Sequence, residues 1–301
     1  MKVAHQVRQK KRARLILIFA FFIAAVLLFT FAFRTGKWDR EEKLILVINR
    51  GGLGVAVVSF GPKVKEINSL IIPGETQVDV AGQLGKWKLK SVWQLGLNEK
   101  IGGGLLAKTI VKNFGFPVIG WADEPAYGFV GGGPKELFKA VFSSYKTNLT
   151  WGDRLKVGFF SLGVARDKKE IRNLAETAVL KKVKFIDGEE GYTIAGQVPG
   201  AVAADFIISE AFSGHLRARI VDRSEGGQIT ERVTRVLQTS GLKVTAISKS
   251  DGADIACRVF GKERKLVERL SFVFDCEVSS QDSGENFDIV IEVGRKFVEK
   301  F

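Results

Sequence analysis

An uninterrupted apolar run, LILIFAFFIAAVLLFTFAF, occupies residues 15–33 and contains no charged side chain. As an α-helix rising about 1.5 Å per residue, it would be roughly 28 Å long, which matches the hydrocarbon core of one bilayer. The run therefore predicts a membrane-spanning helix. Two alternatives stay open, namely a buried core helix and a cleaved signal peptide, although a signal peptide has a shorter apolar region and a small-residue cleavage site.

The charges on either side of residues 15–33 indicate an orientation. Residues 1–14 carry six basic side chains and no acid, whereas residues 34–42 carry three basic and three acidic side chains. Because cytoplasmic flanks are enriched in Lys and Arg, we expect the N-terminus in the cytoplasm and the bulk of the chain outside. The sequence thus predicts a single-pass protein of the cell membrane, with a basic tail (1–14), an anchor (15–33) held by the lipid bilayer, and a brief polar linker (34–42).

The six basic residues of the tail also account for nearly half of the net charge of +13. Once the six tail residues are set aside, the rest of the chain has 40 basic and 33 acidic residues, and these are scattered rather than striped with aromatic residues. Nucleic-acid-binding surfaces cluster their cations. The body is therefore expected to bind no nucleic acid, and its charge suits a solvated surface or attraction to anionic lipids and wall polymers.

Residues 43–212 alternate two kinds of periodicity. Short β-branched runs predict strands, and the first four of these are expected to be successive strands of one sheet; the runs cover 43–49, 55–60, 64–72, 76–80 and 118–122. Helical spacing of apolar residues covers 105–114, 135–145, 151–162 and 201–212. This alternation predicts a layered α/β domain.

Residues 216–301 indicate a second, smaller unit. The patterns predict the order β-α-β-β-α-β-β, with Gly241 ending the first helix at a position where glycine is favoured. The predicted strands are 217–221, 243–247, 257–260, 276–278 and 287–293, and the helices follow Gly226-Gly227 and surround 266–274. This is a compact α+β module.

The chain has two cysteines, Cys257 and Cys276, too few for a disulfide scaffold. Cys257 opens the strand before the second helix, and Cys276 opens the strand after it. If a right-handed crossover sets these strands side by side and parallel, their first residues lie about 5 Å apart, within the Cα range of a disulfide. A bridge and two separate buried thiols both remain compatible with the sequence.

Most of the body resembles a known family. IIPGETQVDVAGQLGKWKLKSVWQLG (71–96) and GGGLLAKTIVKNFGFPVIGWAD (102–123) are similar to the LytR-CpsA-Psr (LCP) domain, with its strand ending in Pro-Arg-Asp, its loop, its Gly-Gly helix start and the strand that follows. The segment 146–160 resembles a later LCP segment. RARIVDRSEGGQITERVTRVLQTSGLKV (217–244) and FDIVIEVGRKF (287–297) resemble the two ends of the LytR C-terminal domain. The resemblance implies a membrane-anchored LCP-like domain over 43–212 and a LytR C-terminal-like domain over 216–301.

The LCP resemblance implies transfer of a phosphate-linked glycopolymer from a polyprenyl pyrophosphate to peptidoglycan, with arginines gripping the pyrophosphate and acids holding a divalent cation. This chain departs from that pattern. Pro73-Gly74-Glu75 stands where the family has Pro-Arg-Asp, and Asn49 stands where a family acid would close the first strand. We therefore expect a cell-envelope protein that binds or assembles cell-wall polymers or polyprenyl-phosphate lipids without catalysis. The alternative is an active phosphotransferase with a rearranged site.

Four residues are the expected ligand contacts: Arg50, Glu75, Lys88 and Lys90. No catalytic residue, metal ligand or cofactor is expected, and Mg²⁺ enters only with the phosphotransferase alternative. Lysines lack the fork geometry of arginine, so they bind pyrophosphate less specifically. Convergence of Arg50, Lys86, Lys88 or Lys90 with Glu75 on one deep, partly apolar cleft able to take a polyprenyl chain would favour the enzyme. A cleft filled by side chains would favour binding alone.

Tryptophans add a further candidate surface. Trp87, Trp93 and Trp121 can stack on sugars or hydrocarbon, although core packing is the commoner role of such rings.

Overall fold

The computed structural model describes residues 19, 36–186, 188–208, 216–225, 227–281, 283–284 and 286–301. The basic tail and, apart from Phe19, the expected anchor lie outside the described residues, as does the junction at 209–215. In the part of the chain that is described, no helix is both long and apolar enough to cross a bilayer. The anchor and its orientation stay predictions.

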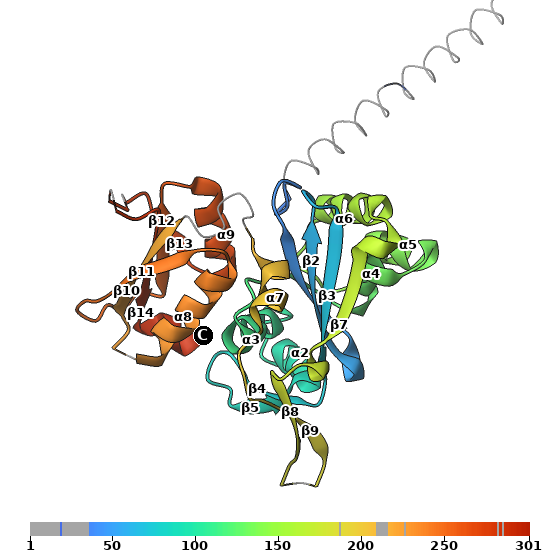
Figure 1. Cartoon of the computed structure of the whole chain (residues 1–301), viewed down its shortest axis with the longest axis horizontal. Coiled ribbons are helices and arrows are strands. Elements are labelled where there is room, and N and C mark those ends of the chain that lie inside the picture. The colour runs from blue at the N-terminus through green and yellow to red at the C-terminus, as the bar shows by residue number, and fades with distance from the viewer. Residues whose placement is uncertain are drawn as a thin grey trace, which may run out of the picture.

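A five-stranded sheet, β6-β1-β2-β3-β7, forms the centre of the first unit (Figure 1). Its strands are β1 Leu44–Asn49, β2 Gly54–Gly61, β3 Glu66–Pro73, β6 Gly120–Ala122 and β7 Lys169–Asn173. Every residue of β1 and β2 is buried, which explains why their sequences are continuous apolar runs rather than alternating ones. β1 pairs antiparallel with β2 and parallel with β6.

Helices cover both faces of this sheet (Figure 1). One face carries α2 Leu89–Asn98 and α3 Gly104–Phe114, and the other carries α4 Gly128–Gly131, α5 Pro134–Phe142 and α6 Trp151–Gly163. On the second face, Phe60 of β2 makes edge contacts with Phe129 of α4 and Phe160 of α6. The layered α/β architecture expected for this unit is confirmed, whereas α2 was not anticipated by the pattern of apolar residues.

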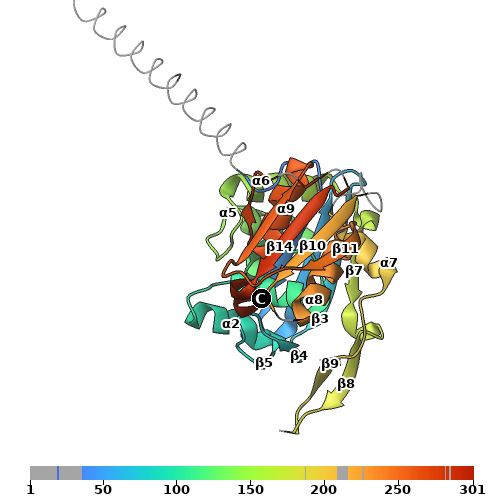
Figure 2. The same cartoon turned by 90° about the vertical axis from the view of Figure 1, so that its left-hand side faces the viewer.

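One strand expected in the central sheet belongs elsewhere. β4 Thr76–Asp79 lies in a second sheet, β5-β4-β9-β8, with β5 Lys86–Lys88, β8 Leu180–Lys184 and β9 Glu190–Ile194. The chain turns sharply at Pro73-Gly74, so β4 leaves the plane of β3. An alternating sequence predicts a strand but does not indicate which strand it pairs with. The β8–β9 hairpin projects at the end of the molecule opposite α6 (Figure 2).

The helix expected over 201–212 is also shorter than the pattern indicates. It consists of α7 Gly200–Ala203 and a 3₁₀ turn, Ala204–Phe206, after which Ile207 is extended. Phe206 anchors this turn, because its ring is buried and packs 4.6 Å from that of Phe116. In the described part of this segment, Val202, Phe206 and Ile208 are buried, and residues 209–212 lie outside the described residues.

The second unit has the expected order of elements. Its mixed sheet is β11-β10-β14-β12-β13, and the final helix was not anticipated. The elements are β10 Arg217–Arg223, α8 Gly227–Thr239, β11 Lys243–Lys249, β12 Cys257–Gly261, α9 Arg264–Phe274, β13 Glu277–Val278, β14 Ile289–Gly294 and α10 Arg295–Lys300. Phe297 of α10 and the terminal Phe301 pack beside Phe274 of α9.

A disulfide joins Cys257 to Cys276, with 4.8 Å between their Cα atoms. β12 and β13 are parallel neighbours, with Arg258 opposite Glu277, so the two cysteines occupy equivalent positions at the starts of their strands. Helix α9 is the crossover between them.

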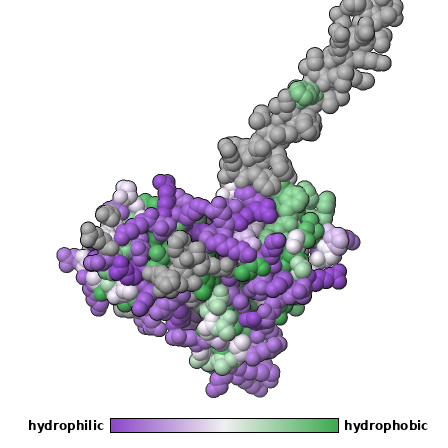
Figure 3. Space-filling view, turned by 45° about the horizontal axis from the view of Figure 1, so that its top comes forward, coloured by the Kyte–Doolittle hydropathy of each residue, from purple (hydrophilic) through white to green (hydrophobic). Residues whose placement is uncertain are grey.

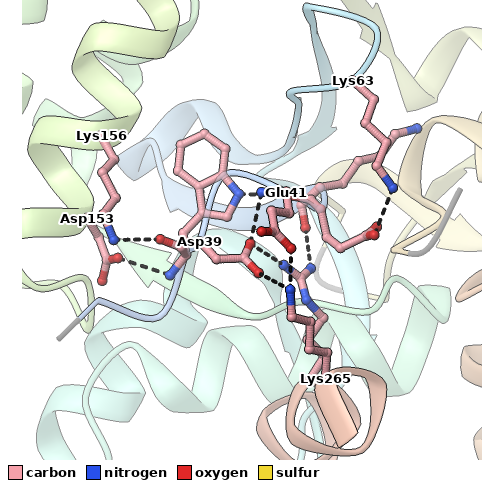
Figure 4. Close-up of polar contacts among 10 residues, drawn as sticks. Asp39, Glu41, Lys63, Asp153, Lys156 and Lys265 are labelled. Atoms are coloured by element: carbon pink, nitrogen blue, oxygen red, sulfur yellow. Dashed lines mark hydrogen bonds and ion pairs between the residues drawn. The ribbon is translucent and has the colours of Figure 1, made fainter. Parts of the chain in front are cut away.

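Residues 36–42, part of the stretch expected as a polar linker, make polar contacts with the body (Figure 4), although Asp39, Arg40 and Glu41 stay exposed. The side chain of Trp38 is fully buried, and Asp39 accepts a hydrogen bond from Arg269 of α9 at 3.4 Å. Arg269 also donates to the backbone oxygen of Lys43 at 2.8 Å. The polar composition of this segment did not predict that it contacts both units. One buried indole, Trp38, and one ion pair, between Asp39 and Arg269, are enough to hold it there.

Candidate functional site

Two of the expected ligand-binding lysines converge on Glu75. The Nζ atom of Lys90 lies 2.6 Å from Oε1 of Glu75, and that of Lys88 lies 3.5 Å from Oε2. Lys88 also forms an ion pair with Glu189. The hydrogen bond from Lys90 holds the pKa of Glu75 below its ordinary value, so the carboxylate is ionised and already neutralised by side-chain cations.

Arg50, the remaining expected ligand contact, has a different neighbour. Its guanidinium lies over the ring of Tyr127, 4.0 Å from the centroid. Beside it, the amide of Asn49 donates to Oδ1 of Asp123 at 2.9 Å. The end of β1 is therefore closed by a stacked arginine and an amide–carboxylate hydrogen bond, and Arg50 makes its contact with an aromatic ring rather than with Glu75.

The backbone around Gly74 leaves no room for a side chain at the position where the LCP pattern has an arginine. An ideal Cβ atom on Gly74 would lie 2.7 Å from the backbone oxygen of Gly52 and 3.0 Å from Cβ of Lys90. The first distance is shorter than real contacts allow, and the obstacle is backbone. A side chain at this position would force the Gly52 loop and the Gly74 turn apart.

The carboxylates that could hold a cation are also occupied. Asp79 forms ion pairs with Lys112 at 3.1 Å and with Arg232 of α8 at 3.4 Å. Across the described ranges, no group of three or more His, Cys, Asp or Glu side chains is arranged to hold a metal ion. These acids therefore act as partners of cations in the fold.

A second location combines aromatic rings with cations. We call it the Trp121 hollow, an open cavity of about 390 Å³. Its lining residues are Leu97, Lys100, Gly102, Trp121, Tyr145, Lys146 and Thr147. Lys100 and Lys146 are exposed, and none of the seven is acidic. The hollow thus offers two aromatic rings and two ammonium groups to a ligand.

Trp121 is held on both sides by the chain that follows α5. Its backbone N–H donates to Oδ1 of Asn148 at 2.8 Å, and its backbone oxygen accepts from the hydroxyl of Thr147 at 2.7 Å. Trp93 packs edge-on against the indole at 5.8 Å. A Cβ on Gly103 would lie 2.3 Å from the Trp121 ring, so the glycine triplet lets α3 begin directly against it.

Tyr145 forms the other aromatic wall. Its hydroxyl donates to the backbone oxygen of Ala140 at 2.6 Å, and the guanidinium of Arg154 lies over its ring at 4.3 Å. Burial raises the pKa of Tyr145 to about 12, so the phenol stays neutral at physiological pH. The ring is therefore fixed in place before any ligand arrives.

A larger cavity of about 430 Å³ adjoins the Trp121 hollow and lies between the two units. Trp121 lines both, and the larger cavity continues along α3 to Lys108 and Asp275. Lys108 and Asp275 form an ion pair at 2.8 Å across the junction, and the hydrogen bond from Lys108 lowers the pKa of Asp275. Trp121 is the one residue that the two linings share.

The sequence pattern singled out Trp121 but missed its surroundings. Lys100, Tyr145 and Lys146 come from two turns that are distant in the chain. The second turn is held beside the indole by a bridge between Thr147 and Ala122 and by the hydrogen bond from Thr147 to Trp121. Of the other tryptophans, Trp87 is half exposed on β5, and Trp93 is buried.

Comparisons with known proteins give the following likenesses. No protein family model matches the chain, and no curated protein matches it. Among solved structures, TagV of Bacillus subtilis is 13% identical with a TM-score of 0.39, and the match covers 52% of this chain and 92% of TagV. TagT of B. subtilis is also 13% identical, with a TM-score of 0.38, covering 54% of this chain and 89% of TagT. A transcriptional regulator from Enterococcus faecalis gives 13% identity and a TM-score of 0.39, covering 68% and 90% respectively.

Proposed function

We propose that this chain is a membrane-anchored, extracytoplasmic LCP-like protein of the cell envelope that binds an anionic cell-wall polymer or polyprenyl-phosphate lipid without transferring it. Its first unit corresponds to the LCP-like domain and its second to the LytR C-terminal-like domain. The anchor is the apolar run at residues 15–33, with the N-terminus in the cytoplasm.

The observation that carries the binding function is the charge and shape of the Trp121 hollow. A sugar presents apolar C–H faces that pack on aromatic rings, and a phosphate-linked polymer adds regularly spaced negative charge. The indole of Trp121 and the ammonium groups of Lys100 and Lys146 meet both requirements within one cavity of about 390 Å³.

The absence of transfer rests on the residues at the end of β1 and β3. Catalysis of pyrophosphate cleavage needs cations that contact the developing charge and an acid that can hold Mg²⁺. Here Gly74 leaves no room for an arginine, and Glu75 is paired with Lys88 and Lys90. These contacts support binding without cleavage of the pyrophosphate.

Polymer binding can be measured directly. The full chain in lipid nanodiscs is titrated with a purified wall teichoic acid fragment, and the affinity is compared with that of Lys100→Ser/Lys146→Ser. We expect the double variant to bind about tenfold more weakly, since each lost charge contact contributes at most about 1 kcal/mol at an exposed site. A matched control, Lys181→Ser/Lys184→Ser on the β8–β9 hairpin, removes the same charge elsewhere and should bind as the parent does. Equal weakening by both pairs would mean that binding is not localised at the Trp121 hollow.

An active phosphotransferase is the second candidate function. It is favoured by the nearness of Lys88 and Lys90 to the turn where the family places its arginine. Metal-dependent release of a sugar phosphate from its polyprenyl carrier would establish this function.

A further inference from the structure

Helices α5 and α6 expose an apolar surface that the proposed polymer site does not use. A groove of about 300 Å³ runs between them, and every residue that lines it is apolar. The lining residues are Pro134, Leu137, Phe138, Val141, Phe142, Leu155, Gly158, Phe159 and Leu162. Figure 3 shows the corresponding green area at the upper right of the molecule, over these two helices.

The outer side of α6 is unusual for a helix at a protein surface. Trp151, Leu155, Phe159 and Leu162 follow one another at helical spacing, and all except Leu155 are exposed, Leu162 by 67%. The inward side of α6 is buried against the central sheet as well. A helix that meets water on one side carries polar residues there, so an apolar outer stripe indicates a non-aqueous neighbour.

α5 extends the same surface. Phe138 is 63% exposed and Phe142 is 53% exposed, and their rings lie 4.7 Å apart. We define the apolar face as Phe138, Phe142, Trp151, Phe159 and Leu162. Five large apolar side chains exposed to water on one surface would favour aggregation, so they indicate an interaction site.

The contacts of residues 36–38 place the apolar face close to the end of the predicted anchor. Gly36 lies against the first turn of α6, since an ideal Cβ on it would collide with the carboxylate of Asp153. The neighbouring residues are tied there too, because the backbone N–H groups of Lys37 and Trp38 donate to Asp153 (Figure 4). The apolar run ends at residue 33, so the chain can place its end at most about 11 Å from Gly36.

The charges around the face suit a lipid headgroup layer. Lys135 and Lys139 are exposed on α5, and Arg166 is exposed just after α6, with Glu136 and Asp167 as the nearby acids. Cations beside an inserted apolar surface strengthen its attraction to anionic lipid. The aromatic Trp151 at the edge of the face is of the type that favours the membrane interface.

We propose that the α5–α6 apolar face inserts into the outer leaflet of the same bilayer that holds residues 15–33. The body then does not swing on its anchor but rests on the membrane with α5 and α6 inserted, and the β8–β9 hairpin points away from it (Figure 2). This proposal rests on the anchoring part of the proposed function and is independent of the Trp121 hollow.

A depth measurement tests this orientation. The full chain carrying Phe159→Cys is labelled with an environment-sensitive fluorophore and reconstituted into vesicles of phosphatidylglycerol and phosphatidylcholine. The native cysteines are closed in a disulfide, so the label reports one site. A matched sample carries Ile186→Cys at the turn of the β8–β9 hairpin, which is fully exposed. We expect the label at position 159 to shift to the blue and to be quenched by lipids with a doxyl group near the headgroup, and the label at 186 to do neither.

Each other outcome overturns the insertion. If the chain floats with the vesicles but both labels stay water-like, the body is anchored without resting on the bilayer, and the anchor survives as a prediction. If the label at 159 is shielded yet not quenched by doxyl lipid, a second copy or another protein covers the face. If the chain does not float at all, both the anchor and the insertion are wrong, whereas polymer binding remains a separate measurement.

Discussion

The carboxylate of Asp153 accepts a hydrogen bond from the backbone N–H of Trp38 at 3.1 Å and thereby joins the start of the body to α6 (Figure 4). Asp153 is fully buried and also completes a capping box with Thr150. One side chain thus satisfies the N-terminus of α6 and fixes the segment that leads from the expected anchor.

Replacing Asp153 with alanine should lower the free energy of unfolding by about 2–4 kcal/mol, because several donors lose their acceptor in a buried place. The donors are the backbone N–H groups of Lys37, Trp38 and Thr150 and the hydroxyl of Thr150. Chemical denaturation of the full chain measures the change. Asp167→Ala, at an exposed position after α6, is the control and should leave stability within about 0.5 kcal/mol. Equal stability of the two variants would mean that the hydrogen bonds to Asp153 do not stabilise the fold.

Placing an arginine at position 74, as in the LCP pattern, should damage the fold rather than create activity. Gly74→Arg places a side chain against the backbone of Gly52, so we expect a loss of about 1–3 kcal/mol in stability. Gly200→Arg is the matched control, because a Cβ at Gly200 meets nothing within 4 Å. Thermal unfolding separates the two. A Gly74→Arg chain that is as stable as the control and gains turnover would show that the site is only one residue away from catalysis.

The disulfide should be formed in the exported protein and should stabilise the second unit. Thiol counting after denaturation without reductant is expected to find no reactive thiol. Because the bridge spans 19 residues, opening it should lower stability by roughly 3 kcal/mol in the chain-entropy account. The serine pair Cys257→Ser/Cys276→Ser provides the comparison. Two reactive thiols in the native exported protein would refute the pairing.

Acid should weaken the contact between the two units. Lys108 donates to Asp275 and holds its pKa below the ordinary value of 3.8, so the folded state favours the ionised carboxylate. The stabilisation is therefore complete above that value and is lost as the pH falls through the lower, folded-state pKa. Between about pH 5 and about pH 2, the protection factors of the α9 amides, which correct for the intrinsic exchange rate at each pH, should fall more in the parent chain than in Asp275→Asn, which lacks the ionisable group. Identical acid profiles would mean that the pair contributes nothing at this junction.

Much of the fold can be predicted from local pattern alone. β1 is recognisable because a strand covered on both faces must be apolar throughout, and α6 is recognisable because Leu155 and Phe159 repeat at helical spacing. The handedness of one crossover predicted that the two cysteines could lie within bonding distance, and the structure has the bridge that the sequence left open. The sheet to which a strand belongs could not be predicted in this way, because the alternating sequence of β4 is compatible with either the central sheet or the small one.

The site was harder to predict because its residues depend on long-range packing. The motif comparison directed attention to Arg50 and Glu75, whose side chains turn out to be engaged by Tyr127 and by two lysines. The Trp121 hollow draws Lys100 and Lys146 from turns that carry no motif of their own. Helical spacing predicts that α6 has an apolar stripe, but it does not indicate which side of the helix faces the core.

Release of product from a polyprenyl-pyrophosphate-linked glycan is the most direct measurement of whether this chain binds without transfer. The full chain in nanodiscs is mixed with such a substrate and a peptidoglycan acceptor, with and without Mg²⁺, and both bound and released glycan are followed. We predict saturable binding and no release above the protein-free background in either condition. Magnesium-dependent release that disappears in Lys88→Ser/Lys90→Ser would contradict the account and establish a phosphotransferase.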